Sequence, residues 1–205
     1  DMKKITLLLS ILSLVIFLTN CDSTTEKKKG IPTATTDTTS QLKSPLEAGQ
    51  EMAMKTKAVL GKYLVTAIQD KGTEGAIEFC STRAIQITDS MSTVLGSRLK
   101  RVAERNRNPV NLASADELSY IKEINASIAR NEKPKPQLKE TAETYTAYYP
   151  ILTEQLCLQC HGNIKADIKP ATLSTINRLY PGEKATGYKL NELRGIWVVE
   201  MKKGE

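Results

Sequence analysis

The sequence predicts an α+β fold in which helices come early in the domain and strands come late. Apolar residues recur at helical spacing between residues 46 and 95. The segment richest in β-branched and aromatic residues lies near the C-terminus and has the composition of a strand. This order of elements is typical of α+β folds. Residues 45–205 are expected to form one domain, which is long enough for one hydrophobic core.

Four helices are predicted from apolar spacing and from residues that begin or end helices. They span residues 46–68, 74–95, 114–131 and 171–180. Gly72, Gly96 and the pair Pro181-Gly182 supply stops. Ser114-Ala115-Asp116-Glu117 is a capping box that begins the third helix.

Extended structure is predicted mainly in the second half of the domain. Residues 99–103 form a short strand, and residues 105–111 form a polar loop around Pro109. Residues 141–152 are rich in Thr and Tyr, and we expect a break at Pro150. Residues 194–201 are the strongest candidate for a strand.

The motif that carries chemistry is Cys157-Leu158-Gln159-Cys160-His161. It matches the C-x-x-C-H signature of covalent c-type haem attachment, in which two thiols form thioethers with the haem vinyl groups. The adjacent histidine then binds the iron. A zinc site or a redox C-x-x-C is the alternative, but zinc would need another nearby Cys or His. The motif therefore predicts one covalent haem c, attached through Cys157 and Cys160 and ligated by His161, in a loop that follows residue 152.

The N-terminus predicts export. Lys3 and Lys4 precede an apolar run over residues 5–18 that is too short for a comfortable membrane span. Leu18-Thr19-Asn20-Cys21 resembles a bacterial lipoprotein cleavage box, although Asn20 departs from the usual small residue. We expect residues 1–20 to be a lipoprotein-type signal peptide and Cys21 to be acylated. An ordinary cleaved signal peptide and an uncleaved anchor are the alternatives.

Residues 21–44 are rich in Thr, Ser, Lys and Asp and lack an apolar period. We expect a lipid-anchored flexible linker. Each interpretation of the N-terminus places the domain in the cell envelope, on the periplasmic or surface side. The net charge of +6 is mild. It favours an acidic partner or a membrane surface and does not indicate a nucleic-acid partner.

Cys80 is a fourth cysteine for which no disulfide partner remains. It lies on the apolar stripe of the second predicted helix, where a free cysteine commonly fills space. Its alternative role is an iron ligand opposite His161, which is the only histidine. On the residues alone, Cys80, a methionine and an open site all remain candidates for the sixth iron position. The candidate methionines are Met52, Met54, Met91 and Met201.

Several segments together resemble a family of small single-haem c proteins with a PAS-like fold. The matching segments are Phe79-Cys80-Ser81, Arg107-Asn108-Pro109 with Asn111, Tyr148-Tyr149-Pro150-Ile151, Cys157 to Gly162, Tyr180-Pro181, Gly187-Tyr188 and Arg194-Gly195. The chain departs from the family pattern at Asn191-Glu192 and at Ile196. Members of this family are secreted, lipid-anchored, or sensor domains of histidine kinases. The resemblance implies a PAS-like antiparallel sheet with N-terminal helices and His161 with Cys80 as the axial pair.

Three functions follow from these expectations. The first is an extracytoplasmic redox or gas sensor in which Cys80 leaves the iron on reduction. The second is a single-haem electron carrier. The third, a haem peroxidase, is disfavoured because the chain has no distal histidine to act as acid and base, so we do not expect an enzyme. Expected partners are the membrane, through the lipid anchor, and an unidentified redox or signalling protein. A homodimer is a further option.

Overall fold

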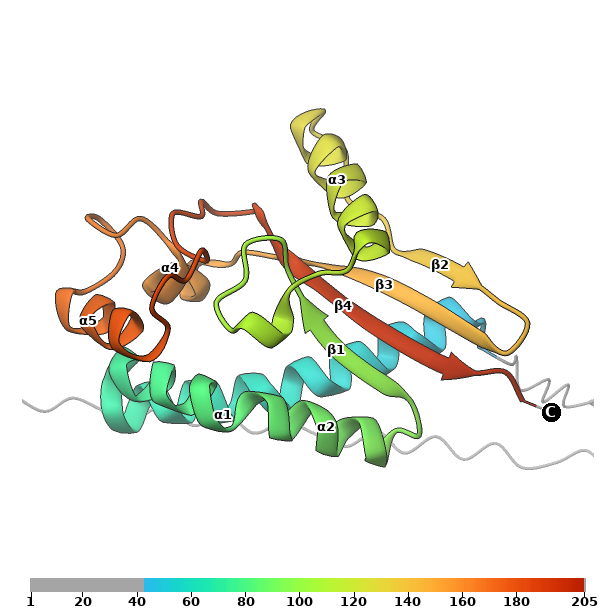
Figure 1. The fold of residues 1–205 in the computed structure, drawn as a ribbon, viewed down its shortest axis with the longest axis horizontal. Coiled ribbons are helices and arrows are strands. Elements are labelled where there is room, and N and C mark those ends of the chain that lie inside the picture. The colour runs from blue at the N-terminus through green and yellow to red at the C-terminus, as the bar shows by residue number, and fades with distance from the viewer. Residues whose placement is uncertain (1–42, 205) are drawn as a thin grey trace, which may run out of the picture. The chain divides into compact units, whose positions relative to one another are not determined.

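Local sequence signals begin and end most helices in the computed structural model, which describes residues 43–204 (Figure 1). Ser44 and Glu47 form a capping box at the start of the first helix, and Ser114 and Glu117 form the predicted one. The helices are α1 (Pro45–Thr82), α2 (Ala84–Val94), α3 (Ala115–Ala129), α4 (Gln155–His161) and α5 (Pro170–Leu179), with a 3-10 turn η1 (Pro109–Asn111). The strands are β1 (Arg98–Val102), β2 (Gln137–Glu140), β3 (Thr144–Leu152) and β4 (Leu193–Lys202).

The four strands form one antiparallel sheet in the order β1-β4-β3-β2. β4 is almost entirely buried because it is central and both faces of the sheet are covered. Its side chains alternate between the two faces. Trp197 and Val199 pack against α1 and its neighbours, whereas Ile196 and Val198 pack against α3.

Helices cover the two faces of the sheet unequally. α1 and α2 lie side by side along one face and α3 lies on the other (Figure 1). α4 and α5 lie at one end of the domain, beyond the C-terminal end of β3 and the N-terminal end of β4 (Figure 1). A smaller cluster of Ile77, Ile168, Ile176 and Tyr180 joins α1 to α5 there. The mixed architecture confirms the predicted α+β class.

The prediction of a break at Pro150 is wrong, because β3 continues through it. Pro150 lies opposite Ile196 of β4. β2 begins at Gln137, which pairs with Tyr148, so the other edge of β3 has no neighbouring strand at Pro150. A missing N–H costs least at such an edge.

The predicted helix stop at Gly72 is confirmed as a non-helical residue (φ 67°, ψ −172°) that divides α1 into two sections. The predicted helix over residues 74–95 is helical up to Val94 except for one interruption. A single turn residue, Arg83, separates α1 from α2, and its backbone (φ −115°, ψ −28°) stays in the right-handed helical region. Section 73–82, which carries Cys80, is therefore bounded by two interruptions of the helix.

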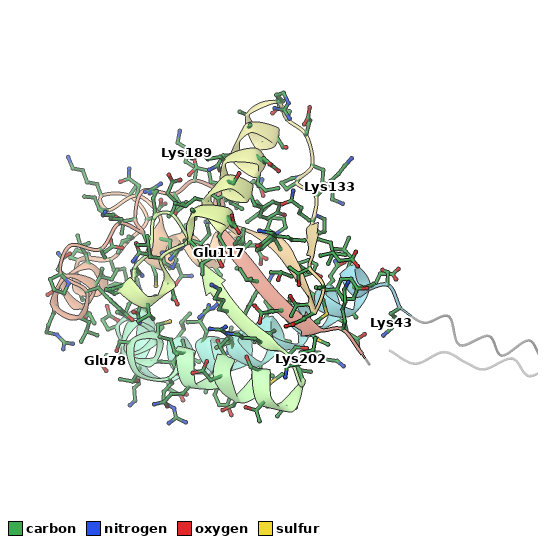
Figure 2. All side chains as sticks on the ribbon, turned by 45° about the vertical axis from the view of Figure 1, so that its right-hand side comes forward. Lys43, Glu78, Glu117, Lys133, Lys189 and Lys202 are labelled. Carbon is green, nitrogen blue, oxygen red and sulfur yellow. The ribbon has the colours of Figure 1, made fainter. Side chains whose placement is uncertain are left out.

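Charged side chains of both signs lie on the outer surface of the domain. Lys43, Lys133, Lys189 and Lys202 project outward, whereas Glu117 lies at the start of α3 (Figure 2). Within residues 43–204 no helix has the length and apolar character needed to cross a bilayer. The predicted signal peptide, the acylated Cys21 and nearly all of the predicted linker lie outside the described residues.

Candidate haem site

A cavity of about 260 Å³ lies where α1, α2 and α4 meet the end of the sheet. Its wall contains Cys80, Cys157, Cys160 and His161, the four residues singled out in the domain sequence. The other lining residues are mostly apolar. The polar ones are Arg101, Asn106, Arg107, Asn108, Asn111, Tyr180 and Arg194. The fold thus brings Cys80 together with a motif that begins 77 positions later in the chain.

The C-x-x-C-H motif is helical, not a loop as predicted from the sequence. Cys157 and Cys160 lie on α4 one turn apart, so both thiols face one side. The Cys157 sulfur accepts a hydrogen bond from the Glu154 backbone N–H at 3.3 Å. Gly162 ends the helix, and its N–H donates to the Leu158 carbonyl at 2.8 Å. Burial raises the pKa of Cys160 to about 11, so this sulfur is a protonated thiol in the chain alone.

One ring nitrogen of His161 is engaged in a hydrogen bond to the backbone. Its Nδ1 lies 2.7 Å from the Ala185 carbonyl oxygen. A carbonyl oxygen can only accept, so Nδ1 carries the hydrogen and Nε2 keeps a free lone pair. Burial lowers the pKa of His161 well below its usual value, and the charges of Arg194 and Arg107 act in the same direction. The imidazole is therefore neutral, which is the form that binds metals.

Cys80 faces the cavity from section 73–82 of α1. Burial raises the pKa of its thiol, and the charges of Arg101, Arg107 and Arg194 oppose that shift. None of Met52, Met54, Met91 and Met201 lines the cavity. Met201 packs in the core and Met52 packs against it, while Met54 is 43% exposed on α1.

A buried ion pair fixes the wall behind α4. The Arg107 Nε donates to Glu183 at 3.3 Å, and both side chains are less than one-tenth exposed. Arg107 Nη2 also donates to the Cys160 carbonyl at 2.6 Å. The Glu183 carboxylate accepts from the Ala185 N–H at 2.7 Å. The pair therefore ties the haem motif to the same loop that holds His161.

Two other arginines line the cavity without a carboxylate partner among residues 43–204. Arg101 of β1 has its guanidinium 5.4 Å from the centre of the Trp197 ring. Arg194 of β4 donates from Nη1 to the Arg105 carbonyl at 3.3 Å, yet its Nε is buried with no hydrogen-bond partner. Burial lowers the pKa of both arginines. Their placement calls for an anionic group in the cavity.

These residues fit a covalent haem. Two thiols one helical turn apart, a neutral histidine with a free Nε2 and a largely apolar wall meet its chemical requirements. Unpartnered arginine nitrogens suit carboxylates. Within residues 43–204, no three His, Cys, Asp or Glu side chains converge as a site for a bare metal ion.

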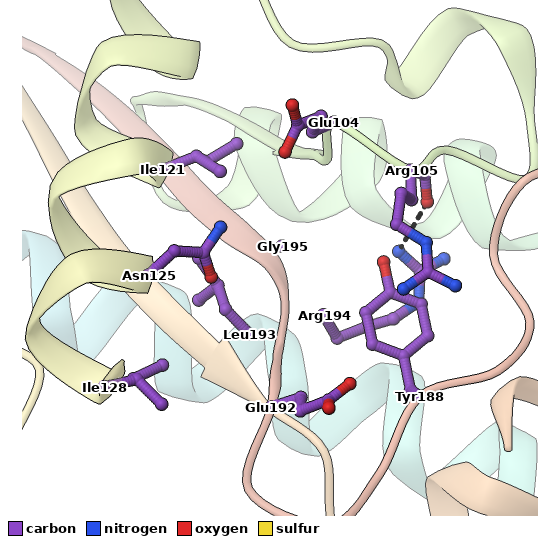
Figure 3. Close-up of a pocket in the computed structure, with 10 residues that line it drawn as sticks. All are labelled: Glu104, Arg105, Ile121, Asn125, Ile128, Tyr188, Glu192, Leu193, Arg194 and Gly195. Carbon is purple, nitrogen blue, oxygen red and sulfur yellow. Dashed lines mark hydrogen bonds between the residues drawn. The ribbon is translucent and has the colours of Figure 1, made fainter. Parts of the chain in front are cut away.

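Two further arginines, Arg83 and Arg105, do not line the cavity. Arg83 is exposed. Arg105 stacks on Tyr188, with 4.1 Å from its guanidinium carbon to the ring centre, and donates to the Lys184 and Thr186 carbonyls. It lines a separate groove of about 220 Å³ between α3 and the start of β4, where Arg194 also lies (Figure 3).

Sequence analysis missed Arg101 and gave Arg194 no role beyond the family resemblance. The alternation of residues along the predicted strand could have indicated Arg101. In a strand, residues two apart share a face, so Arg101 lies on the face of Leu99, which packs toward α1 and α2. Assigning that face requires knowing which side the helices cover.

Comparisons with known proteins identify the family and a similar fold. Residues 22–201 match the model of the Tll0287-like family. The crystal structure of the cyanobacterial haem protein Tll0287 superposes with a TM-score of 0.57 at 17% sequence identity, covering 80% of this chain and 99% of that one. A search of curated proteins gave no significant match. Because the family match spans most of the chain, the protein belongs to the Tll0287-like family.

Proposed function

We propose that this protein binds one haem c covalently through Cys157 and Cys160, with His161 and Cys80 as the axial iron ligands. The observation that carries the proposal is the single cavity that all four side chains line. Cys80 reaches it from a different helix, which a structural cysteine in a core would not need to do. The similar fold of a cyanobacterial haem protein adds support. We extend the proposal to a PAS-like classification of the sheet and helices.

Each residue has a role that its surroundings support. His161 presents Nε2 because the Ala185 carbonyl occupies Nδ1. Cys80 would bind as a thiolate, whose charge Arg101, Arg107 and Arg194 stabilise. When bound, haem supplies an iron that changes oxidation state and can bind a gas.

The proposed role is an extracytoplasmic redox or gas sensor, tethered through Cys21. Section 73–82 supports it because this section is bounded by Gly72 and Arg83 and packs on α5. Thr73 and Thr172 share a buried hydrogen bond, Ile77 packs on Ile176, and Arg178 pairs with Glu78. Release of the Cys80 thiolate would free this section and disturb α5, a change that a partner protein could detect.

Electron transfer is the second candidate. Leu156 lines the cavity and is 40% exposed, which favours a cofactor edge close to the surface. A carrier would keep both axial side chains in place in both oxidation states. We do not propose an enzymatic activity, since no further histidine is available as an acid or base.

Purified protein from a host that matures c-type cytochromes tests haem attachment. The mass should include one haem, which should remain with the polypeptide in acid acetone. A Cys157→Ala/Cys160→Ala variant should release it. A wild-type protein that yields its haem to acid acetone would refute covalent attachment.

Visible spectra with and without CO separate the sensor from the carrier. The sensor role predicts that reduced protein binds CO readily and loses the spectral features of thiolate ligation. If reduced protein ignores CO and passes electrons rapidly to a partner cytochrome, the carrier role stands and the sensor role is wrong.

A further inference from the structure

The candidate haem cavity contains more positive charge than its own residues neutralise. Arg101, Arg107 and Arg194 line it, whereas none of the lining residues is Asp or Glu. Burying unpaired charge is unfavourable, so a folded protein normally supplies a counter-charge. Either another part of the chain or a bound group must provide it.

For Arg107 the counter-charge comes from the chain itself. Glu183 lies 3.3 Å from Arg107 Nε, and the carbonyls of Cys160 and Ala185 accept from Nη2. Its hydrogen-bonding capacity is largely used. Arg107 therefore serves to fix the wall of the cavity and has little left to offer a ligand.

Arg101 and Arg194 form no salt bridge within residues 43–204, and Glu183, the carboxylate near Arg194, is already paired with Arg107. Arg101 makes only the contact with the Trp197 ring. Arg194 lies beside Tyr188 and Arg105 in Figure 3, with one hydrogen bond from Nη1 to a carbonyl. Its Nε is buried and unpartnered. An anionic acceptor at this position would satisfy it.

The two arginines lie at the same end of the sheet on neighbouring strands. Val102 of β1 pairs with Ile196 of β4 in an antiparallel ladder, so Arg101 and Arg194 lie on opposite sides of this pair, roughly 10 Å apart along the strands. Haem carries both propionate carboxylates on one edge of its ring. Both arginines line the same cavity, so two cations face the space that a ligand with two carboxylates would occupy.

We propose that Arg101 and Arg194 bind the two haem propionates, one arginine to each. The proposal rests on haem binding in this cavity, as proposed above. The arginine guanidinium suits a carboxylate because its planar fork can donate two parallel hydrogen bonds. Two other nearby arginines, Arg105 and Arg107, are excluded by their existing partners.

The charges of the assembled site then cancel. A ferric porphyrin core has one positive charge, which the Cys80 thiolate would neutralise. The two propionates add two negative charges, and Arg101 with Arg194 supply two positive ones. Arg107 and Glu183 form a neutral pair of their own. A neutral assembly is the least costly to enclose in an apolar cavity.

Resonance Raman spectroscopy of the holoprotein tests the assignment, because propionate bending bands move when a propionate loses a hydrogen bond. Arg101→Gln should shift the band of one propionate, Arg194→Gln that of the other, and the double variant both. Arg98→Gln is the matched control, since Arg98 is an exposed arginine on β1 that does not line the cavity. It should leave both bands in place. Arg194→Lys should shift its band less than Arg194→Gln because it retains the charge.

The outcomes separate this assignment from the proposed function. If Arg101→Gln and Arg194→Gln bind haem but leave both propionate bands unchanged, the assignment is overturned and haem binding stands. The same holds if Arg98→Gln moves the bands equally. If Arg194→Gln fails to assemble, Arg194→Lys and Arg101→Gln decide the matter through their own bands. A wild-type protein that binds no haem overturns the proposed function and the assignment together.

Discussion

Single residues at this site act mainly through the partners that the fold gives them. Arg107 and Glu183 are charged residues that are almost fully buried, and each also holds a backbone group of the haem motif or its supporting loop. Breaking such a pair leaves one charge buried and uncompensated. An exposed pair of the same chemistry stays hydrated in the folded protein and therefore contributes little to stability.

Glu183→Gln should therefore lower the free energy of unfolding by about 3–5 kcal/mol. Glu78→Gln is its control, because the Glu78–Arg178 pair is more than half exposed and should cost less than about 1 kcal/mol. Urea denaturation of both variants measures the difference. Equal losses would show that the Arg107–Glu183 pair does not stabilise the fold beyond an exposed pair.

The proposed Cys80 ligand can be tested in the same way at the residue scale. Cys80→Ala should convert the ferric iron from low spin to high spin, and Cys80→Met should raise the midpoint potential. Met91→Leu is the control, since Met91 does not line the cavity. Electron paramagnetic resonance reads the spin state. A low-spin spectrum in Cys80→Ala would assign the sixth position to another side chain.

At the scale of elements, interruptions of helix α1 position the candidate ligand. Gly72 has φ 67° and ψ −172°, a conformation that is essentially confined to glycine. It redirects the chain so that section 73–82 packs on α5 and presents Cys80 to the cavity. Without the kink, α1 would continue straight and Cys80 would point elsewhere.

Gly72→Ala should accordingly cost on the order of 1–3 kcal/mol and alter the visible spectrum of the holoprotein. Gly61→Ala, on the same helix, should instead stabilise by about 0.5–1 kcal/mol. Gly61 has ordinary helical geometry, and an added Cβ there meets no atom within 4 Å. Thermal and urea unfolding compare the two. A neutral Gly72→Ala with an unchanged spectrum would mean that the kink does not set the ligand position.

At the scale of the whole domain, the chain enters at the end opposite the candidate haem cavity. α1 begins at the end opposite α4 and α5, near the C-terminal end of β4 (Figure 1). The section of α1 before Gly72 spans roughly 40 Å at 1.5 Å per residue. The start of α1 and the candidate haem cavity are therefore separated by the length of this section.

The lipid tether remains a prediction that Cys21 can test. Radiolabelled palmitate should enter the wild-type protein and not Cys21→Ser, and only the wild type should sediment with membranes. Cys80→Ser serves as a control for labelling at other thiols. Labelling that persists in Cys21→Ser would rule out acylation at this residue.

Much of the fold could be predicted from the sequence because the signals are local. Apolar spacing and the capping box at Ser114 located helices, and β-branched composition located β4. The failures lie where tertiary context overrides a local rule. Pro150 stays in a strand because its edge faces no neighbour, and the predicted helix over 74–95 is split at Arg83.

The sequence by itself determined the chemistry on offer: two thiols at C-x-x-C spacing, one histidine and one further cysteine. Spacing along a chain is visible in the sequence because it needs no folded partner. Only the tertiary structure decided that Cys80 meets that motif in one cavity, that Ala185 leaves Nε2 of His161 free, and which arginines lining it form no salt bridge within residues 43–204. Those relations join residues far apart in the chain, and packing of helices against a sheet creates them.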